Sequence, residues 1–153
     1  SGHEEPCFAS LGSWVLSLGF NVSLFNPSSR LVTPSQDFTN ESIQLRVWQK
    51  AVDLAVDVCR RTKSFPSEER FALASQINRC AVSIASNIAE GAGRNNPKEF
   101  NNFLGIASGS CCELETQLIT AERLKYLTRD ENRTLVETID EIQKMIYKLQ
   151  KTL

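Results

Sequence analysis

Histidine is almost missing from this chain. Of the 153 residues only His3 is a histidine, and it lies in an initial Ser-Gly-His stretch typical of a cloning scar. A cysteine nucleophile is usually activated by a histidine, and a histidine-rich metal site needs several imidazoles. The helical part of the chain also lacks the Glu-x-x-His pairs that hold metal ions in helical bundles. We therefore expect no catalytic residue, no metal, no cofactor and no enzymatic activity.

Cysteine is present, but not in the patterns that carry chemistry. The five cysteines are odd in number and form no Cys-x-x-Cys motif. Two of them, Cys111 and Cys112, are adjacent, so on a helix their side chains would point about 100° apart. Such cysteines are usually small apolar residues buried in proteins of a reducing compartment. The sequence therefore predicts a cytoplasmic protein.

A strong excess of one charge is missing as well. The formal net charge is −1, and four of the 18 acidic residues but only one of the 17 basic residues fall within residues 1–44. The rest of the chain thus carries a small positive excess. That excess is too small for a strongly basic nucleic-acid surface, although it permits a local basic patch.

Long apolar runs are missing too. The best candidate, residues 11–25, is interrupted by Asn21 and by serines, and it is too short to span a membrane. A signal peptide would begin with basic residues, whereas Glu4 and Glu5 precede this stretch. We expect no membrane partner.

The chain divides into two parts. Apolar residues alternate with small or polar ones over 14–24, which is the period of a strand, and residues 26–42 have the Ser and Pro content of a linker. Residues 1–43 are therefore predicted to be a non-helical or poorly ordered N-terminal extension, as a tag scar, an arm or a linker. Residues 44–153 are predicted to form one helical domain.

Apolar residues in this second part recur every three or four positions, which indicates amphipathic helices. The spacing predicts a first helix over residues 45–63, ending before Pro66. A second helix is predicted to begin after Ser67 and to stop at Gly91 and Gly93.

The third and fourth helices have strong start signals. Asn96 as N-cap and Pro97 at the first helical position predict a helix that continues through Leu124. Thr128 and Glu131 have the spacing of a capping box. Four amphipathic helices with short connections predict an all-α fold, an up-and-down antiparallel four-helix bundle. The apolar stripe of the fourth helix is Leu135, Ile139, Ile142, Ile146 and Leu149.

The second helix has a wide apolar face and only a narrow polar stripe, about 100° wide. A helix of this kind is expected to bury one side in its own bundle and a second side elsewhere. In the third helix Gly105 and Gly109 are four residues apart, which allows another helix to approach closely. The apolar face of the second helix is Phe71, Leu73, Ala74, Ile77, Ala81, Ile84 and Ile88.

Polar residues of these two helices are predicted to form a structural hydrogen-bonded network, because buried polar groups need partners. Glu90 and Glu113 could alternatively form a carboxylate pair for acid–base or metal chemistry, but no histidine accompanies them. The predicted network consists of Ser83, Asn87, Glu90, Ser110 and Glu113.

Six motifs of the helical part carry a family resemblance: FPSEERF, SQINR, SIASNIAEG, KEFNNFL, GSCCELETQL and RLKYL. With them, residues from 45 to about 150 resemble the four-helix-bundle family of proteins encoded by intervening sequences in bacterial 23S ribosomal RNA genes, once labelled ribosomal protein S23. Accessory proteins of diversity-generating retroelements, which assist a reverse transcriptase, resemble the same bundle. The resemblance implies a homopentamer and a link to RNA. The chain departs from the family pattern at Ser108, where a basic residue is expected, and at Cys112, where a small apolar residue is usual.

Two functions remain open. The first is a non-enzymatic oligomeric adaptor that associates with RNA or with an RNA-bound protein. The alternative is a structural or protein–protein interaction scaffold that binds no nucleic acid. Basic residues near the end of the first helix also have a structural explanation, since they stabilise a helix C-terminus. The candidate RNA contacts are Arg60, Arg61, Lys63, Arg79 and Arg94.

Overall fold

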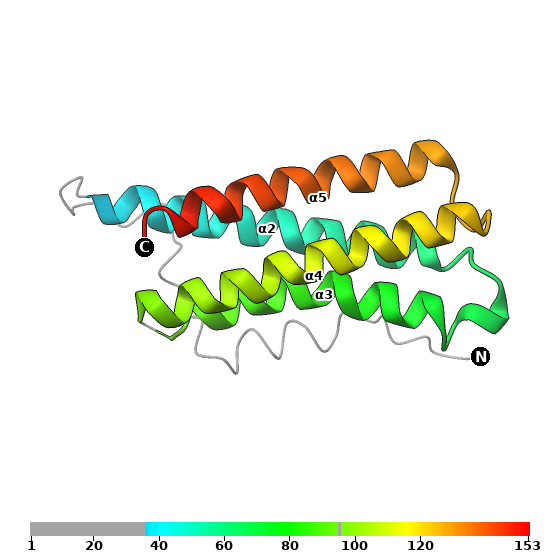
Figure 1. The fold of residues 1–153 in the computed structure, drawn as a ribbon, viewed down its shortest axis with the longest axis horizontal. Coiled ribbons are helices and arrows are strands. Elements are labelled where there is room, and N and C mark those ends of the chain that lie inside the picture. Colours follow the sequence, from blue (N-terminus) through cyan, green and yellow to red (C-terminus); the bar gives the residue numbers. More distant parts are fainter. Residues whose placement is uncertain (1–35, 95) are drawn as a thin grey trace, which may run out of the picture.

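The computed structural model describes residues 36–94 and 96–153, with side chains from residue 43 onward. This part of the chain contains helices and no strand, which confirms the predicted all-α bundle (Figure 1). The predicted strand-like alternation over 14–24 lies outside the described residues. The elements are α2 (Gln36–Thr62), the short 3-10 helix η2 (Ser67–Glu69), α3 (Leu73–Ala92), α4 (Pro97–Arg123) and α5 (Arg129–Gln150).

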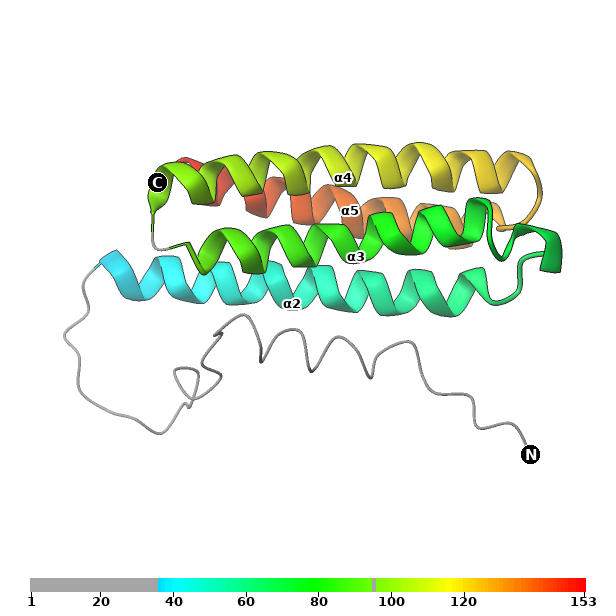
Figure 2. The same ribbon diagram turned by 90° about the horizontal axis from the view of Figure 1, so that it is seen from below.

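The four long helices run up and down around one core. Figure 2 shows α3 lying between α2 and α4. The helix α5 packs against α4 and closes the bundle against α2. The α2–α3 and α4–α5 connections meet at one end of the bundle, and the α3–α4 turn lies at the other (Figure 1). Within 36–94 and 96–153, no helix combines the length and the apolar character that crossing a membrane requires.

The core is built from the predicted stripes. All five apolar residues of the α5 stripe are at most 1% exposed, and Ile77, Ile84 and Ile88 of α3 are equally buried. Burying a side chain of this size stabilises a fold by about 1.5–3 kcal/mol relative to leaving it in water. The helical period of the sequence thus identified the faces that pack.

The predicted caps of α4 and α5 are present. Asn96 accepts hydrogen bonds from the backbone N–H groups of Lys98 and Glu99, at 3.0 and 3.3 Å. Thr128 and Glu131 form the reciprocal bonds of a capping box. These starts were predictable because a cap involves only residues within one helical turn.

The start of α2 was predicted too late. The helix begins at Gln36 and not at Leu45, so residues assigned to the linker continue the helix. No proline interrupts the chain between Gln36 and Thr62, so nothing in its covalent structure stops the helix there.

The start of α3 was predicted too early, with a consequence for Phe71. The chain after Ser67 forms η2 and then a turn, and α3 begins only at Leu73, after an N-cap residue, Ala72, with φ −107° and ψ −111°. Phe71 therefore does not share the phase of α3. The prediction that it lies on the apolar face is wrong, because its side chain is 89% exposed.

Gly91 permits a close helix contact within the chain. A Cβ atom on Gly91 would lie 2.6 Å from Cβ of Phe103 and 2.8 Å from Cδ2 of Phe100, so α3 approaches α4 closely there. At Gly105 and Gly109 a Cβ would meet no described atom within 4 Å. These two glycines are exposed and bring no helices together within the chain.

Candidate functional site

The contact between α3 and α4 contains a small polar cluster in an otherwise apolar core. The hydroxyl oxygens of Ser83 and Ser110 are 3.0 Å apart, and Asn87 donates to the hydroxyl and to the carbonyl oxygen of Ser83, at 3.0 and 2.8 Å. The thiol of Cys80 donates to the Ser110 carbonyl at 3.1 Å. These four residues hold α3 and α4 in one register, because a shift of either helix would leave buried polar groups without partners.

The two acidic residues predicted for this network lie apart from its serines. Glu90 accepts a hydrogen bond from Arg94 at 2.8 Å, on an exposed part of α3. Glu113 accepts one from Gln117 at 3.0 Å and lies beside the Cys80 thiol. The structure thus brings Ser83, Asn87 and Ser110 together, adds Cys80, and leaves Glu90 outside.

The buried thiols are poor nucleophiles. Burial and, to a smaller extent, the nearby Glu113 carboxylate together raise the pKa of Cys80 from 9.0 to about 12. Burial also raises the pKa of Cys111 to about 12. A protonated thiol is unreactive, so neither residue offers a thiolate at neutral pH.

Of the five basic candidates, three lie at the end of α2. Arg61 forms ion pairs with Asp57 at 3.1 Å and with Glu131 of α5 at 3.7 Å, so its charge is used within the bundle. Arg60 and Lys63 are exposed and form no ion pair with any described residue.

Of the other two basic candidates, one forms an ion pair within the described chain and the other forms none. Arg94 pairs with Glu90 at 2.8 Å, and its guanidinium carbon lies 5.4 Å from the centre of the Phe103 ring. Arg79 is exposed, and no carboxylate of the described chain pairs with it. Arg94 is at the opposite end of α3 from the α2 terminus, about 30 Å away by helix length. The five residues therefore do not form one patch.

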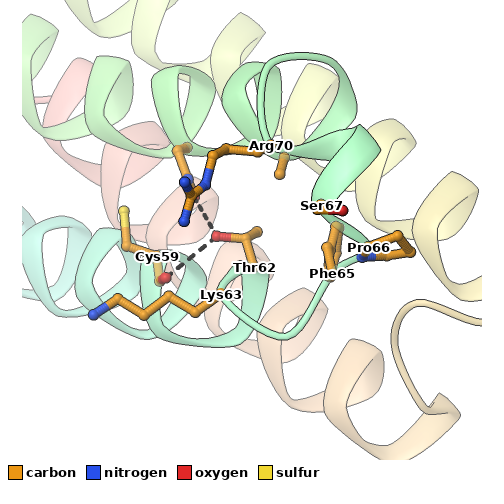
Figure 3. A pocket seen from close by; sticks show the side chains of 9 residues that line it. Cys59, Thr62, Lys63, Phe65, Pro66, Ser67 and Arg70 are labelled. Carbon is orange, nitrogen blue, oxygen red and sulfur yellow. Dashed lines mark hydrogen bonds between the residues drawn. The ribbon is translucent and has the colours of Figure 1, made fainter.

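A pocket lies at the end of the bundle where α2 leads into α3, and it has a volume of about 570 Å³. Arg70 reaches over it from the turn before α3, and Lys63 extends from the residue after α2 (Figure 3). At its base the Thr62 hydroxyl lies 2.8 Å from Oδ1 of Asn78 and 3.2 Å from the Cys59 carbonyl. The remaining lining residues are Phe65, Pro66, Ser67 and Ala74.

Sequence reasoning missed this pocket and the role of Arg70 in it. The Phe65 ring packs against Tyr126 with centroids 5.5 Å apart, and the Tyr126 hydroxyl donates to Glu69 at 3.3 Å. These contacts join the α2–α3 connection to the α4–α5 connection, far away in sequence. The sequence showed an aromatic residue in each of the two connections, but it did not show that the two rings pack against each other.

The outward side of α4 is unusually poor in charge. Among its exposed positions from 101 to 120 only Glu113 is charged, and Ile106 and Ile119 are 52% and 39% exposed. On α5 the exposed positions from 129 to 148 are charged except for Thr134 and Tyr147. We call the exposed positions of α4 from 101 to 120 the α4 outer face: Asn101, Asn102, Gly105, Ile106, Gly109, Cys112, Glu113, Thr116, Ile119 and Thr120.

Two features of the described surface are open to a ligand or partner. No group of three or more histidine, cysteine or acidic residues within the described ranges is placed to hold a metal ion. The polar cluster of α3 and α4 is occupied by its own hydrogen bonds. The pocket and the α4 outer face remain as features open to a ligand or partner.

Two comparisons with known proteins agree with this fold. A family model described as 23S rRNA-intervening sequence protein matches residues 43–148. A crystal structure from Bacteroides thetaiotaomicron, of a protein with unknown function from the S23 ribosomal protein family, is 28% identical and has a TM-score of 0.67. That likeness covers 71% of this chain and 98% of the neighbour. No curated protein matches the chain.

Proposed function

The chain belongs to the family of 23S rRNA-intervening sequence proteins, and on that premise we propose that it is a non-enzymatic bundle that assembles with itself and associates with RNA or with an RNA-bound protein in the cytoplasm. The observation that carries the proposal is the contrast between the α4 outer face and the charged outer face of α5. We take the number of subunits, five, from the family resemblance.

Self-assembly is supported by the α4 outer face. Protein interfaces are depleted in charge at their centre, whereas free surfaces of small proteins carry many charged residues. Gly105 and Gly109 lie in this face with open space above them. A helix of another copy can approach such positions more closely than it can approach a surface of long side chains. The adjacent surface of α3, around Ser86, is also uncharged between Arg79 and Glu90.

RNA association is supported by the exposed cations that lack a carboxylate partner in the described chain, among them Arg60, Lys63 and Arg79. In a cyclic assembly each of them is repeated once per subunit. A modest patch then becomes a ring of positive charge, whose affinity for phosphates depends steeply on salt.

Light scattering with a matched pair of variants tests the assembly. Thr116 and Thr134 are both exposed threonines whose hydroxyls bond the carbonyl four residues earlier, at 2.9 Å in each case. Thr116→Arg places a long charged side chain in the α4 outer face, and Thr134→Arg places it on α5. We expect wild type and Thr134→Arg to have about five times the 17.1 kDa subunit mass, and Thr116→Arg to have less. A monomeric wild type would overturn the proposal.

RNA association is tested by measuring the affinity for a structured RNA over a series of salt concentrations. Arg79→Glu should weaken binding and reduce the salt slope by about one per lost phosphate contact. Arg133→Glu is the control, because Arg133 is exposed on α5 and already pairs with Asp130 at 3.0 Å. If binding is absent, or insensitive to salt and to Arg79→Glu, the protein-interaction scaffold becomes the better interpretation.

A further inference from the structure

The pocket between the end of α2 and the start of α3 has the size of a small-ligand site. Its volume of about 570 Å³ lies within the range of roughly 300–1,000 Å³ that is common for such sites. Its wall is partly apolar, through Phe65, Pro66 and Ala74, and its rim is polar. Phe65, in the apolar part of the wall, packs against the Tyr126 ring with centroids 5.5 Å apart.

The charges at this pocket are all of one sign. Lys63 and Arg70 line it, and no carboxylate does. Neither cation forms an ion pair with a residue of the described part of the chain. The nearby Glu69 does not line the pocket. Its carboxylate accepts hydrogen bonds from the Tyr126 hydroxyl and from the backbone N–H of Leu73. The electrostatic environment therefore favours an anion.

The hydrogen-bonding groups that remain available are mainly donors. Lys63 and Arg70 can only donate. Asn78 has its carbonyl oxygen bonded to Thr62, which leaves its NH₂ group for a ligand. Ser67 adds an exposed hydroxyl. A ligand with several acceptor oxygens satisfies this set, and an arginine guanidinium is well shaped to bind two oxygens of a phosphate.

The dipole of α2 opposes the binding of an anion at this pocket, and hydrogen bonds to carbonyl groups near the end of the helix reduce this effect. The C-terminal end of α2 carries partial negative charge on its last carbonyl groups. However, the carbonyl of Cys59 accepts from Thr62, and that of Arg61 accepts from the hydroxyl of Ser64 at 2.8 Å. These bonds partly neutralise the carbonyls that would face the ligand.

We infer that this pocket binds single-stranded RNA. Lys63 and Arg70 bind the phosphate group of one nucleotide, and Phe71 stacks on the base of that nucleotide. Phe71 follows Arg70 in the chain and its ring is 89% exposed. Proteins that bind single strands combine a positively charged groove with aromatic rings on which the bases stack. The inference rests on the proposed association with RNA and assigns it a site.

The test uses the full chain and a fluorescent uridine oligonucleotide of about ten nucleotides, with binding followed by anisotropy. The pocket variant is Lys63→Gln with Arg70→Gln. The control is Lys125→Gln with Arg129→Gln, which removes the same charge from exposed residues at the same end of the bundle. We expect the pocket variant to bind at least about tenfold more weakly and the control to change by less than about threefold.

Two further measurements complete the test. Phe71→Ala should weaken oligonucleotide binding but leave the competition by inorganic phosphate unchanged. Competition by uridine monophosphate as strong as that by unlabelled oligonucleotide would assign the pocket to a terminal or free nucleotide, and weak competition would assign it to a phosphate within a strand. Equal weakening of pocket variant and control, or no effect in either, overturns the inference.

Failure of the inference is distinguishable from failure of the proposed function. If the pocket variant binds structured RNA as wild type does, while Arg79→Glu weakens binding, then the protein binds RNA elsewhere and only the pocket assignment fails. If wild type binds neither the oligonucleotide nor structured RNA at low salt, both fail together.

Discussion

At the scale of single residues, Gly91 sets how closely α3 and α4 approach. Its missing side chain is replaced by the Phe103 and Phe100 side chains of α4. The nearest atom, Cβ of Phe103, is bonded directly to the α4 backbone and cannot rotate away. A methyl group at position 91 would therefore push the two helices apart and disturb the nearby Ser83–Ser110 contact.

We predict that Gly91→Ala destabilises the protein by about 1–3 kcal/mol, although alanine is the better helix former. Gly93→Ala is the control, because a Cβ there would be no closer than 3.5 Å to its neighbours and the φ of Gly93 is −74°. Urea unfolding followed by circular dichroism measures both. A Gly91→Ala protein as stable as the Gly93→Ala protein would show that the close contact does not exist.

The cysteines provide a second prediction at this scale. In a Cys7→Ser protein that also carries Thr116→Arg, so that no second copy covers the α4 outer face, a disulfide reagent at pH 8 should label the exposed Cys112 rapidly and the half-buried Cys59 more slowly. Cys80 and Cys111 should react only after unfolding, since both are buried and have a pKa of about 12. Rapid labelling of all four thiols would contradict this packing.

The same two thiols make stability depend on pH. Their folded pKa of about 12 is above the unfolded value of 9.0, so the folded state holds its protons more tightly. Their contribution to stability is complete below pH 9 and decreases as the pH rises from 9 toward 12. In thermal melts over this range, replacing Cys111 by alanine should reduce the loss of stability with pH.

At the scale of the element, the end of α4 is closed by a residue in an unfavourable conformation. Lys125 has φ 66°, in the left-handed region. Its N–H donates to the carbonyl of Glu122, and the N–H of Tyr126 donates to that of Ala121, both at 2.9 Å. This pair of bonds is the Schellman motif, in which glycine is usual after the helix because a Cβ is strained there. The turn positions Tyr126 against Phe65, beside the pocket.

We predict that Lys125→Gly raises the free energy of unfolding by about 1 kcal/mol, since it relieves the left-handed strain. Lys125→Ala is the control, because it removes the charge and keeps the Cβ, and it should leave stability nearly unchanged. Chemical denaturation of the three proteins gives the comparison. Equal stabilisation by alanine would show that the charge of Lys125, and not its backbone conformation, is unfavourable.

At the scale of the whole molecule, α2 extends beyond the domain boundary that the sequence predicted. The helix begins at Gln36, within the segment assigned to the linker. Ile43, the last residue of the predicted extension, packs against the core of the bundle.

We predict that a protein lacking residues 1–35 keeps the helical content and cooperative unfolding of the full chain. Removing residues 1–43 should cost about 1–3 kcal/mol more, because the Ile43 contact and two helical turns are lost. Circular dichroism and thermal melts of both truncated proteins test this. An unfolded product of the shorter deletion would show that residues 1–35 contribute to the bundle.

The amino-acid sequence by itself determined the helical class, the cap residues Asn96 and Thr128, and the buried stripe of α5. These features depend on residues within one or two helical turns, so local spacing is enough to predict them. It also indicated that α3 buries an unusually large share of its surface. The start of α3 escaped this reasoning, because the period of three to four residues continues through a turn as readily as through a helix.

Only the tertiary structure decided which residues meet. It separated Glu90 from the Ser83 cluster, paired Arg61 with Glu131 of another helix, and left Arg70 beside Lys63 over a pocket. It also made Gly91 a position where α4 leaves no room for a side chain, while Gly105 and Gly109 face open space. The physical reason is the same in each case. These contacts depend on which faces of different helices touch and at what register, and the packing of the whole core fixes that choice.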